Sequence, residues 1–534
     1  MAQHEQKLAI LRQENGNLKS QIRTLRLENE KCNKELEDLR QENKTLKSEN
    51  SKLGSQLQDI QNELPSPEER YAFNLDVLFL LSVTCCSKPL KQCTSPAKVF
   101  SPWTQHKESL VSIGIDFGTA FTGYSFSFKG AKQIRQPKWG EEYGMNTPKT
   151  PTCILFDEDG NFLKFGYDAI MTYTRQTRRN EAKKLYLFDD FKMELYGKVL
   201  HRDSMMTAKN GKKMRAMKVF SESLKFMKDH ALDMIGKHTS EVTYSASDAT
   251  WVLTVPAIWS SAAKQFMTEA AIEAGLVSEF EPEKLIVALE PEAASVWCKQ
   301  LPKEGFMEGD LTEEETIEQV PGTQYMVVDC GGGTIDITVH EVVEGGRLKE
   351  LHRVSGNNLG GQTVDKNFKS FLREILSEKV FDEFEENYPS ELKRLMYDFS
   401  MCKRYDGEVL VQCPYNLQEL ARKVKDIEDY FEGNSEAEWE SGSILLSGTK
   451  LRALHDDCII GIENLMEGIL EKSNLNIRYI LLVGGFALSP YVNSFVKEKF
   501  GSKYKVLCPV DAALAVVNGA VLFGRMPNVV ESRI

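Results

Sequence analysis

The sequence predicts a large α/β domain, internally duplicated, that follows a parallel coiled coil. Three observations predict this arrangement. Apolar residues recur at heptad spacing through residues 1–64. From residue 110 onward, short β-branched runs alternate with amphipathic helical patterns, which is typical of an α/β fold. A strand that delivers an aspartate to a glycine turn, followed by a second strand, occurs at Asp116 and again at Asp329, which indicates an internal duplication.

The composition excludes several classes of protein. With 534 residues, 41% of them hydrophobic and 27% charged, the chain is neither disordered nor fibrous. A formal net charge of −12 argues against nucleic acid as a partner. The first residues contain no apolar core of a secretory signal, and no apolar run is long enough to predict a transmembrane segment. We therefore expect a cytoplasmic location, with the eleven cysteines as reduced thiols.

The first element, residues 1–64, carries the heptads of a coiled coil. The d row is Leu11, Leu18, Leu25, Cys32, Leu39, Leu46, Leu53 and Ile60. The a row contains four asparagines, Asn15, Asn29, Asn43 and Asn50. Buried asparagine pairs fix the register and favour two strands, so the pattern predicts a parallel homodimer. A solitary charged helix is the alternative.

Residues 65–109 form a linker or irregular segment. Pro65 and Pro67 end the coiled-coil helix, and further prolines interrupt the rest. Residues 74–86, "NLDVLFLLSVTCC", are apolar but too short to span a bilayer. A buried strand or helix is the ordinary interpretation of this stretch, and a membrane-touching, acylated segment is the alternative.

The globular domain then begins with strand and helix signals. "TWVLTVPAIW" indicates a buried strand, and "SSAAKQFMTEAAIEAGL" a helix capped by Ser260 or Ser261 and ended by Gly275. "RYILLVGGFALSPYVNSFVKEKFG" repeats this order, with Ser489 as N-cap and Gly501 as terminator.

Two glycine turns carry the chemistry. "VSIGIDFGTAFTGYSFSF" and "YMVVDCGGGTIDITVHEV" each place an aspartate, glycines and a threonine between two strands. Glycines let backbone N–H groups approach a phosphate, and the aspartates would repel that phosphate unless Mg²⁺ stood between them. Two such hairpins facing each other would enclose a Mg-nucleotide.

The order of motifs then becomes specific. D-F-G-T, L-T-V-P-A, E-P-E-A-A, D-C-G-G-G-T-I-D, N-L-G-G and V-G-G-F follow one another along the chain. This order resembles the ATPase domain of the seventy-kilodalton heat-shock proteins, a two-lobed domain with the actin-like, ribonuclease-H-like fold, over about residues 110–525. "FKMEL" and "AVVNGAVLFGRMPNVV" are most similar to the divergent twelfth branch of that family, which lacks the usual peptide-binding domain. We expect residues 110–534 to form this domain.

The resemblance implies ATP or ADP with Mg²⁺ as ligands and assigns roles to matching residues. Asp116 and Asp329 would hold the hydrated Mg²⁺, Glu290 would orient the attacking water, and Asp336 would add a carboxylate nearby. Lys192 would face the γ-phosphate, with Lys183 or Lys184 as alternatives. The phosphates would be cradled by Gly118, Thr119, Gly331, Gly332, Gly333 and Thr334, and the adenosine would lie near Gly360, Gly361, Lys403, Arg404, Gly484 and Gly485. For Lys403 and Arg404, an ordinary solvated helix face is the alternative.

Departures from the family pattern limit the expected activity. Ala120 and Phe121 stand where a threonine and a tyrosine are usual, and Phe486 and Leu488 replace residues that hold the base. Hydrolysis is therefore expected to be slow, and we expect neither the acidic-hydrophobic linker nor the β-rich domain of peptide refolding. The alternatives are a nucleotide-gated scaffold that does not hydrolyse ATP and a small-molecule kinase of the same fold. A co-chaperone or client protein is the partner that the resemblance implies.

Overall fold

The computed structural model of the chain describes residues 109–177, 182–198, 201–239, 242–278, 281–307, 317–472 and 474–533. These residues belong to one compact unit, Gln105–Ile534. The coiled coil expected over residues 1–64 lies outside the described residues, as do residues 65–108 with the apolar stretch 74–86. The predictions for these segments therefore stay predictions.

The first lobe is built on a five-stranded sheet of order β10-β9-β1-β2-β3. Its strands are β1 (Val111–Phe117), β2 (Phe121–Phe128), β3 (Thr150–Pro151), β9 (Ala249–Val255) and β10 (Leu285–Leu289). β1 pairs antiparallel with β2 and parallel with β9, which pairs parallel with β10. β1 is buried along its whole length, so apolar and polar residues do not alternate in its sequence as they do in a strand with one solvated face.

The second lobe repeats this arrangement in a six-stranded sheet of order β18-β17-β11-β12-β13-β19. Its strands are β11 (Gln324–Cys330), β12 (Ile335–Val342), β13 (Leu348–Asn357), β17 (Ile477–Val483), β18 (Lys505–Leu507) and β19 (Val530–Ser532). β11 pairs antiparallel with β12 and parallel with β17, as β1 does with β2 and β9. The pairing shows the duplication that the two glycine turns predict.

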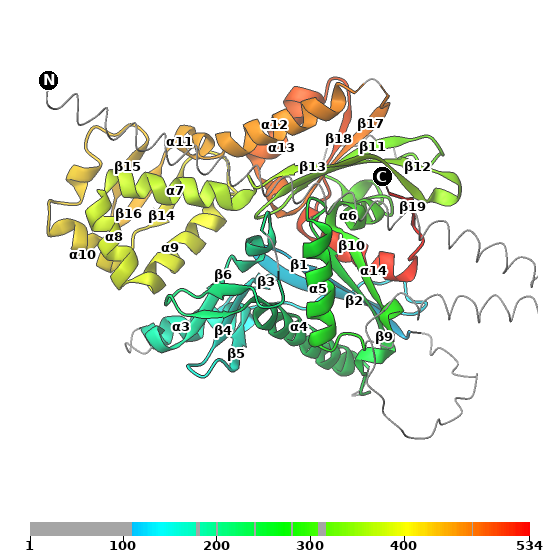
Figure 1. The fold of residues 1–534 in the computed structure, drawn as a ribbon. Helices are drawn as coiled ribbons and strands as arrows, with labels where there is room; N and C mark the ends of the chain where they lie inside the picture. Colours follow the sequence, from blue (N-terminus) through cyan, green and yellow to red (C-terminus); the bar gives the residue numbers. More distant parts are fainter. Residues whose placement is uncertain are drawn as a thin grey trace, which may run out of the picture. The chain divides into compact units, whose positions relative to one another are not determined.

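Two helices lie between the sheets, and each packs on the sheet of the lobe that does not precede it in the sequence (Figure 1). α6 (Glu290–Cys298) follows the first sheet but packs on β11, β12 and β17 of the second. α14 (Ala515–Arg525) follows the second sheet but packs on β1, β2 and β9 of the first. The two helices also pack against each other, and a Cβ at Gly519 would lie 1.7 Å from the Ala293 carbonyl oxygen. Only glycine permits this approach.

The remaining elements cover the two sheets and extend each lobe. In the first lobe these are β4 (Cys153–Phe156), β5 (Phe162–Phe165), α3 (Gly166–Thr177), β6 (Tyr186–Asp189), β7 (Met205–Thr207), β8 (Lys213–Arg215), α4 (Ala216–His238) and α5 (Ser261–Glu273). In the second they are α7 (Gly361–Ile375), α8 (Glu378–Asn387), α9 (Pro389–Cys402), β14 (Val409–Gln412), α10 (Tyr415–Arg422), β15 (Ala437–Glu440), β16 (Ser443–Leu446), α11 (Gly448–Ala453), α12 (Asp456–Leu470) and α13 (Pro490–Phe500). Each lobe has its own apolar core, and a third cluster surrounds α6 and α14.

Both helices begin and end at the predicted residues, but a side-chain capping hydrogen bond forms at only one of them. Ser260 Oγ accepts a hydrogen bond from the backbone N–H of Ala263, and Gly275 ends the helix region at φ 70°. Ser489 precedes α13, but its side chain makes no capping hydrogen bond. Gly501 directly follows the last residue of α13 and is its C-cap, as predicted, with φ −64°.

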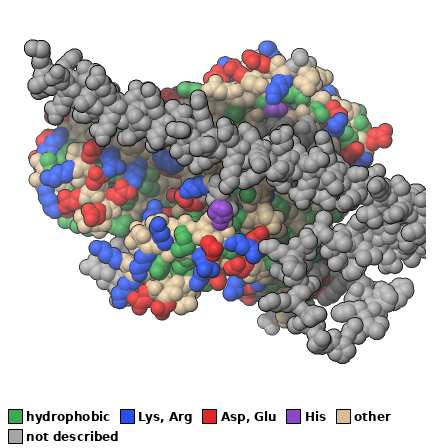
Figure 2. Space-filling model, viewed as in Figure 1, with side chains coloured by type: hydrophobic (Ala, Val, Ile, Leu, Met, Phe, Trp, Pro, Cys, Tyr) green, Lys and Arg blue, Asp and Glu red, His purple; other side chains and the backbone are tan. Residues whose placement is uncertain are grey.

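Charge and hydropathy are unremarkable on the surface that the structure describes. On the face drawn in Figure 2, basic side chains are interspersed with acidic ones over the coloured part of the molecule. Among the described residues, no helix combines the length and the apolar character that crossing a membrane requires.

Candidate functional site between the lobes

The two glycine turns meet at a cavity of about 230 Å³. A Cβ at Gly333 would lie 2.6 Å from Thr119 Oγ1, and one at Gly332 would lie 2.9 Å from the Ala120 Cβ, so the turns touch. Most of the predicted site residues line this cavity: Asp116, Gly118, Thr119, Lys192, Glu290, Asp329, Gly331, Gly332, Gly333, Thr334, Gly361, Lys403, Arg404, Gly484 and Gly485. The structure therefore brings together residues that are nearly 400 positions apart in the sequence.

Each turn is held in place by hydrogen bonds to its own lobe. Thr152 Oγ1 donates to the Gly118 carbonyl oxygen at 2.7 Å, which fixes the first turn against the strand region around β3. In the second turn the Gly331 N–H donates to the Thr334 carbonyl oxygen at 2.9 Å. The Gly361 N–H, at the start of α7, donates to the Gly331 carbonyl oxygen at 3.0 Å. These hydrogen bonds fix the position of each turn relative to its own lobe.

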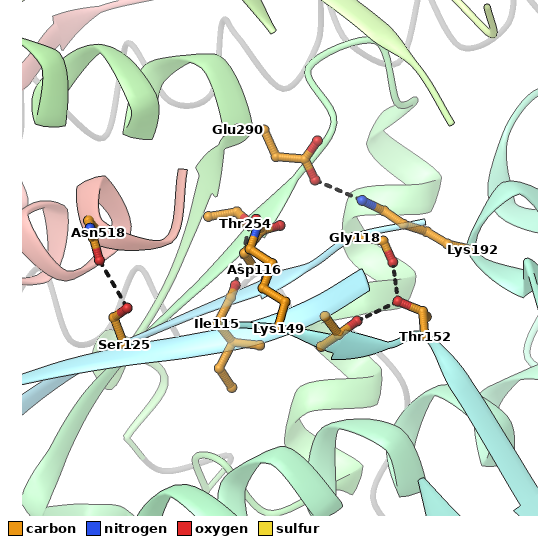
Figure 3. A network of polar contacts seen from close by, with 11 residues as sticks. Ile115, Asp116, Gly118, Ser125, Lys149, Thr152, Lys192, Thr254, Glu290 and Asn518 are labelled. Carbon is orange, nitrogen blue, oxygen red and sulfur yellow. Dashed lines mark hydrogen bonds and ion pairs between the residues drawn. The ribbon is translucent and has the colours of Figure 1, made fainter. Parts of the chain in front are cut away.

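A buried ion pair stands at one side of the cavity (Figure 3). Lys192 comes from a short 3-10 helix, Phe191–Leu195, and its Nζ lies 2.7 Å from Glu290 Oε1. The Lys192 side chain is only 2% exposed. Burial raises the pKa of Glu290 to about 7, Lys192 opposes this rise, and Asp116 and Asp336 add to it. The site thus combines a buried lysine with a carboxylate whose pKa is raised by burial.

Lys149 contacts the first aspartate, and the sequence analysis did not identify it. Its Nζ lies 2.5 Å from Asp116 Oδ2, and both side chains are largely buried. The other oxygen, Oδ1, lies 3.4 Å from Thr254 Oγ1 (Figure 3). Asp116 therefore already has a cationic partner, and a metal ion would share this carboxylate with Lys149.

The pKa of Asp329 is strongly shifted by its surroundings. Burial raises its pKa well above the ordinary value, and the nearby Glu290, Asp336 and Asp116 raise it further. A divalent cation would relieve this repulsion. Among the described residues no group of three or more His, Cys, Asp or Glu is placed to enclose a bare metal ion. The buried carboxylates of Asp116 and Asp329 line the same cavity as the glycine turns, a donor set that would suit a hydrated Mg²⁺, which keeps several waters and binds one or two carboxylates together with phosphate oxygens.

Two predicted site residues do not line the cavity. Asp336 lies opposite Asp329 in the β11–β12 register, but its Oδ1 accepts a hydrogen bond from the Ile258 N–H at 3.0 Å. Ile258 belongs to the first lobe, so Asp336 connects the lobes behind the cavity. Gly360 precedes α7, where a Cβ would lie 2.6 Å from the Gly332 carbonyl oxygen. It permits close packing of α7 on the second turn.

The opposite end of the cavity is basic and aromatic. Lys403 is buried, and its Nζ lies 2.5 Å from the Gly361 carbonyl oxygen and 2.7 Å from Asp365 Oδ2. Lys403 therefore does not belong to a solvated helix face, whereas Arg404 is exposed and follows the end of α9. Phe486 lines the cavity and packs against Gly361, where a Cβ would lie 3.1 Å from its ring. Leu488 packs in the core of the second lobe instead.

The alternative lysines lie elsewhere. Lys183 and Lys184 are exposed, and Lys184 Nζ lies 4.0 Å from Glu158 at the surface. Neither lines the cavity. Besides Lys149, sequence reasoning missed Tyr167, Gln362, Asp365, Tyr397 and Ser489, which also line it. These residues stand outside the glycine motifs, and only Gln362 and Asp365 carry a signal, because they follow Gly361 in the first turns of α7.

Polar contacts join the lobes above the cavity. Asp189, at the end of β6, pairs with Lys393 of α9 across the cleft. The side chain of Gln362 in α7 donates a hydrogen bond to the neighbouring Asp190. Burial lowers the pKa of Lys393, but the nearby Asp189 raises it above the ordinary value overall. These contacts hold the lobes closed over the cavity.

Comparison with known proteins agrees with this architecture. The family model for Hsp70 protein matches residues 189–530. The chain belongs to the Hsp70 family. Heat shock 70 kDa protein 12B of Homo sapiens is 33% identical over 507 residues, which cover 84% of this chain and 73% of that protein. Heat shock 70 kDa protein 12A of Mus musculus is 31% identical over 496 residues, with 82% and 73% covered. The human 12A protein is 31% identical over 484 residues, with 80% and 71% covered.

Membership confirms the resemblance that the motifs predict, including the branch. This Hsp70-family chain contains an actin-like ATPase domain, and nucleotide binding follows in general terms from that membership.

Proposed function

We propose that the chain binds MgATP between its two lobes and hydrolyses it slowly. The observation that carries this proposal is the Lys192–Glu290 pair, buried beside two touching glycine turns in one cavity. A cation and a carboxylate at this place fit the needs of phosphoryl transfer, in which positioning and electrostatic stabilisation supply most of the catalysis.

The chain's own residues would divide the work as follows. Backbone N–H groups of Gly331, Gly332 and Gly333 would hold the terminal phosphates. Lys192 would approach the γ-phosphate and balance the charge that spreads over its oxygens. Glu290 would orient the water whose oxygen attacks phosphorus, while the bond to the β-phosphate oxygen breaks and ADP leaves with the electron pair. Mg²⁺, when bound, supplies further positive charge, and Asp116 and Asp329 would hold its hydration shell.

Slow turnover is expected from three features of the site. Lys149 competes for Asp116 at 2.5 Å, and Ala120 and Phe121 offer no hydroxyl donor to the phosphates. The base would lie against Phe486, which stacks with His455 at 5.9 Å between ring centroids. Such a contact favours a flat base but gives little discrimination between bases.

The same features favour a second candidate, a nucleotide-gated scaffold that binds ATP without hydrolysing it. Single-turnover measurement with radiolabelled ATP separates the two proposals. Conversion of bound ATP to ADP and phosphate within minutes to an hour supports the enzyme. ATP that stays intact for many hours while it still protects the chain from protease supports the scaffold.

We also propose that residues 1–64 make the protein a parallel dimer. The heptads contain leucine at six of eight d positions, and asparagine at four a positions specifies two strands. Light scattering on the full chain and on a 65–534 fragment tests this. A dimeric full chain and a monomeric fragment that still binds nucleotide are expected, and a fragment that remains dimeric contradicts the proposal.

A further inference from the structure

The last described residues run along the edge of the second sheet. β19 pairs parallel with β13, with Val530 opposite Leu348 and Ser532 opposite Lys349. The Leu348 N–H donates to the Val529 carbonyl oxygen at 2.8 Å. β19 is therefore the edge strand of the second sheet (Figure 1), and it carries Arg533 toward α6.

Arg533 makes a two-point ion pair with Glu292. Its Nε lies 2.6 Å from Glu292 Oε1, and one terminal nitrogen lies 2.7 Å from Oε2. The Glu292 side chain has no exposed surface, whereas the Arg533 side chain is 47% exposed. A buried carboxylate that loses its cation is costly, because neither water nor another charge replaces the lost partner. This pair is thus different from the exposed pairs elsewhere on the surface.

The other ionisable groups around this pair do not form an ion pair with Glu292. Lys264 of α5 interacts electrostatically with Glu292 and Arg533, but its Nζ donates a hydrogen bond to the Ala257 carbonyl oxygen, 3.4 Å away. His340 of β12 is fully buried, and burial lowers its pKa to about 4, so it is neutral at physiological pH. Glu350 and Asp336 add negative charge to the surroundings. Arg533 is therefore the cation on which Glu292 depends.

Glu292 stands in the helical turn that begins with Glu290. α6 starts at Glu290, and Glu292 is its third residue, with Oε2 3.4 Å from the Leu289 N–H. One turn of helix contains 3.6 residues, so both carboxylates move with the same backbone. Glu290 in turn contacts Lys192 in the cavity. Arg533 is thereby linked to the reacting end of the site through two residues of one turn.

We propose that Arg533 is a positioning residue of the ATPase. By holding Glu292 it fixes the first turn of α6, and this turn sets the direction of Glu290 toward Lys192 and the attacking water. The inference rests on the proposed function and deepens it, since it makes the chemical step depend on a strand at the far edge of the second sheet. Arg533 contacts neither the cavity nor its ligands, so nucleotide affinity should not depend on it.

The test compares Arg533→Gln with two matched variants in the full chain. Arg347→Gln removes an exposed ion pair with Glu531 at the same pair of strands and leaves Glu292 untouched. Arg533→Lys keeps the charge but loses the two-point geometry. Single-turnover hydrolysis and MgATP affinity are measured for each variant. Hydrogen exchange of residues 285–298 is followed without nucleotide, so that it is independent of turnover.

Arg533→Gln should slow hydrolysis at least tenfold, change MgATP affinity less than threefold, and speed exchange in residues 285–298. Arg533→Lys should restore part of the rate, and Arg347→Gln should behave as the unmodified protein. Equal exchange and equal turnover in Arg533→Gln and Arg347→Gln would overturn the inference. If the unmodified chain does not hydrolyse ATP, the proposed function fails, and unchanged exchange in Arg533→Gln would separately refute the positioning role.

Discussion

The substitution Gly484→Ala tests how the second lobe holds Asp329. Gly484 follows β17 with φ 88° and ψ 160°, a backbone conformation that is essentially confined to glycine. A Cβ there would lie 2.4 Å from the Cys330 carbonyl oxygen and 2.5 Å from Asp329 Oδ1. The backbone neighbour cannot rotate away, so either the turn or the Asp329 carboxylate must move.

The expected cost has two parts. A residue other than glycine in this conformation costs about 1–3 kcal/mol. Forcing a methyl group into a packed site costs about 1–3 kcal/mol more. Together they lower the free energy of unfolding by about 2–6 kcal/mol. With an unfolding entropy of about 2.1 cal/mol/K per residue over roughly 425 residues, this corresponds to a fall in the thermal midpoint of about 2–7 °C.

Gly485→Ala is the matched control, because its Cβ would meet only the Ala513 Cβ at 3.8 Å, an ordinary contact. Thermal unfolding of both variants is followed without nucleotide. We expect Gly484→Ala to melt about 2–7 °C below Gly485→Ala. Equal midpoints would refute the argument that the turn around Gly484 is both strained for other residues and closed around Asp329.

Three further predictions concern the cavity and its closure. Lys192→Ala should lower single-turnover hydrolysis at least tenfold, whereas Lys184→Ala, which removes only a surface pair, should leave it unchanged; equal rates would contradict the lysine assignment. Without nucleotide, the free energy of unfolding should fall as pH rises from about 4.5 to 7, because the folded state binds the extra proton of Glu290, and Glu290→Gln should reduce this fall in urea titrations at pH 5 and 8. A fall as large in Glu290→Gln as in the unmodified chain would show that Glu290 is not responsible. Lys393→Ala should speed nucleotide release in stopped-flow measurements, because it breaks the ion pair with Asp189 across the cleft. Arg394→Ala, which changes the exposed neighbouring residue, is the control and should leave the release rate unchanged.

The glycine turns were predictable from the sequence because their function requires unusual residues in a fixed order. An aspartate at the end of an apolar run, followed by glycines and threonine, indicates a strand, a tight turn and a second strand, and β1–β2 and β11–β12 form where this pattern predicts them. The start of α6 at Glu290 was not among the predictions, although proline at the second helical position and a preceding apolar run mark such a boundary.

The contacts of Lys149 and Arg533 could not be predicted in this way. Lys149 lies in a bend directly before the two-residue strand β3, and Arg533 follows an edge strand of three residues, so neither stands in a periodic or glycine-rich pattern. Their partners, Asp116 and Glu292, are set by tertiary packing that brings distant segments together. The sequence likewise left open whether Lys403 lines the site or a solvated helix face, because its burial depends on contacts with α7, which is distant in the sequence.

The central claim is that Asp329 and the two turns hold a Mg-nucleotide, and calorimetric titration tests it most directly. ATP is titrated into the unmodified chain and into Asp329→Asn, each with and without Mg²⁺. The account predicts binding that depends on Mg²⁺ and is at least tenfold weaker in Asp329→Asn, a difference of about 1.4 kcal/mol. Binding that is equally tight without Mg²⁺, or unchanged by Asp329→Asn, would contradict the account.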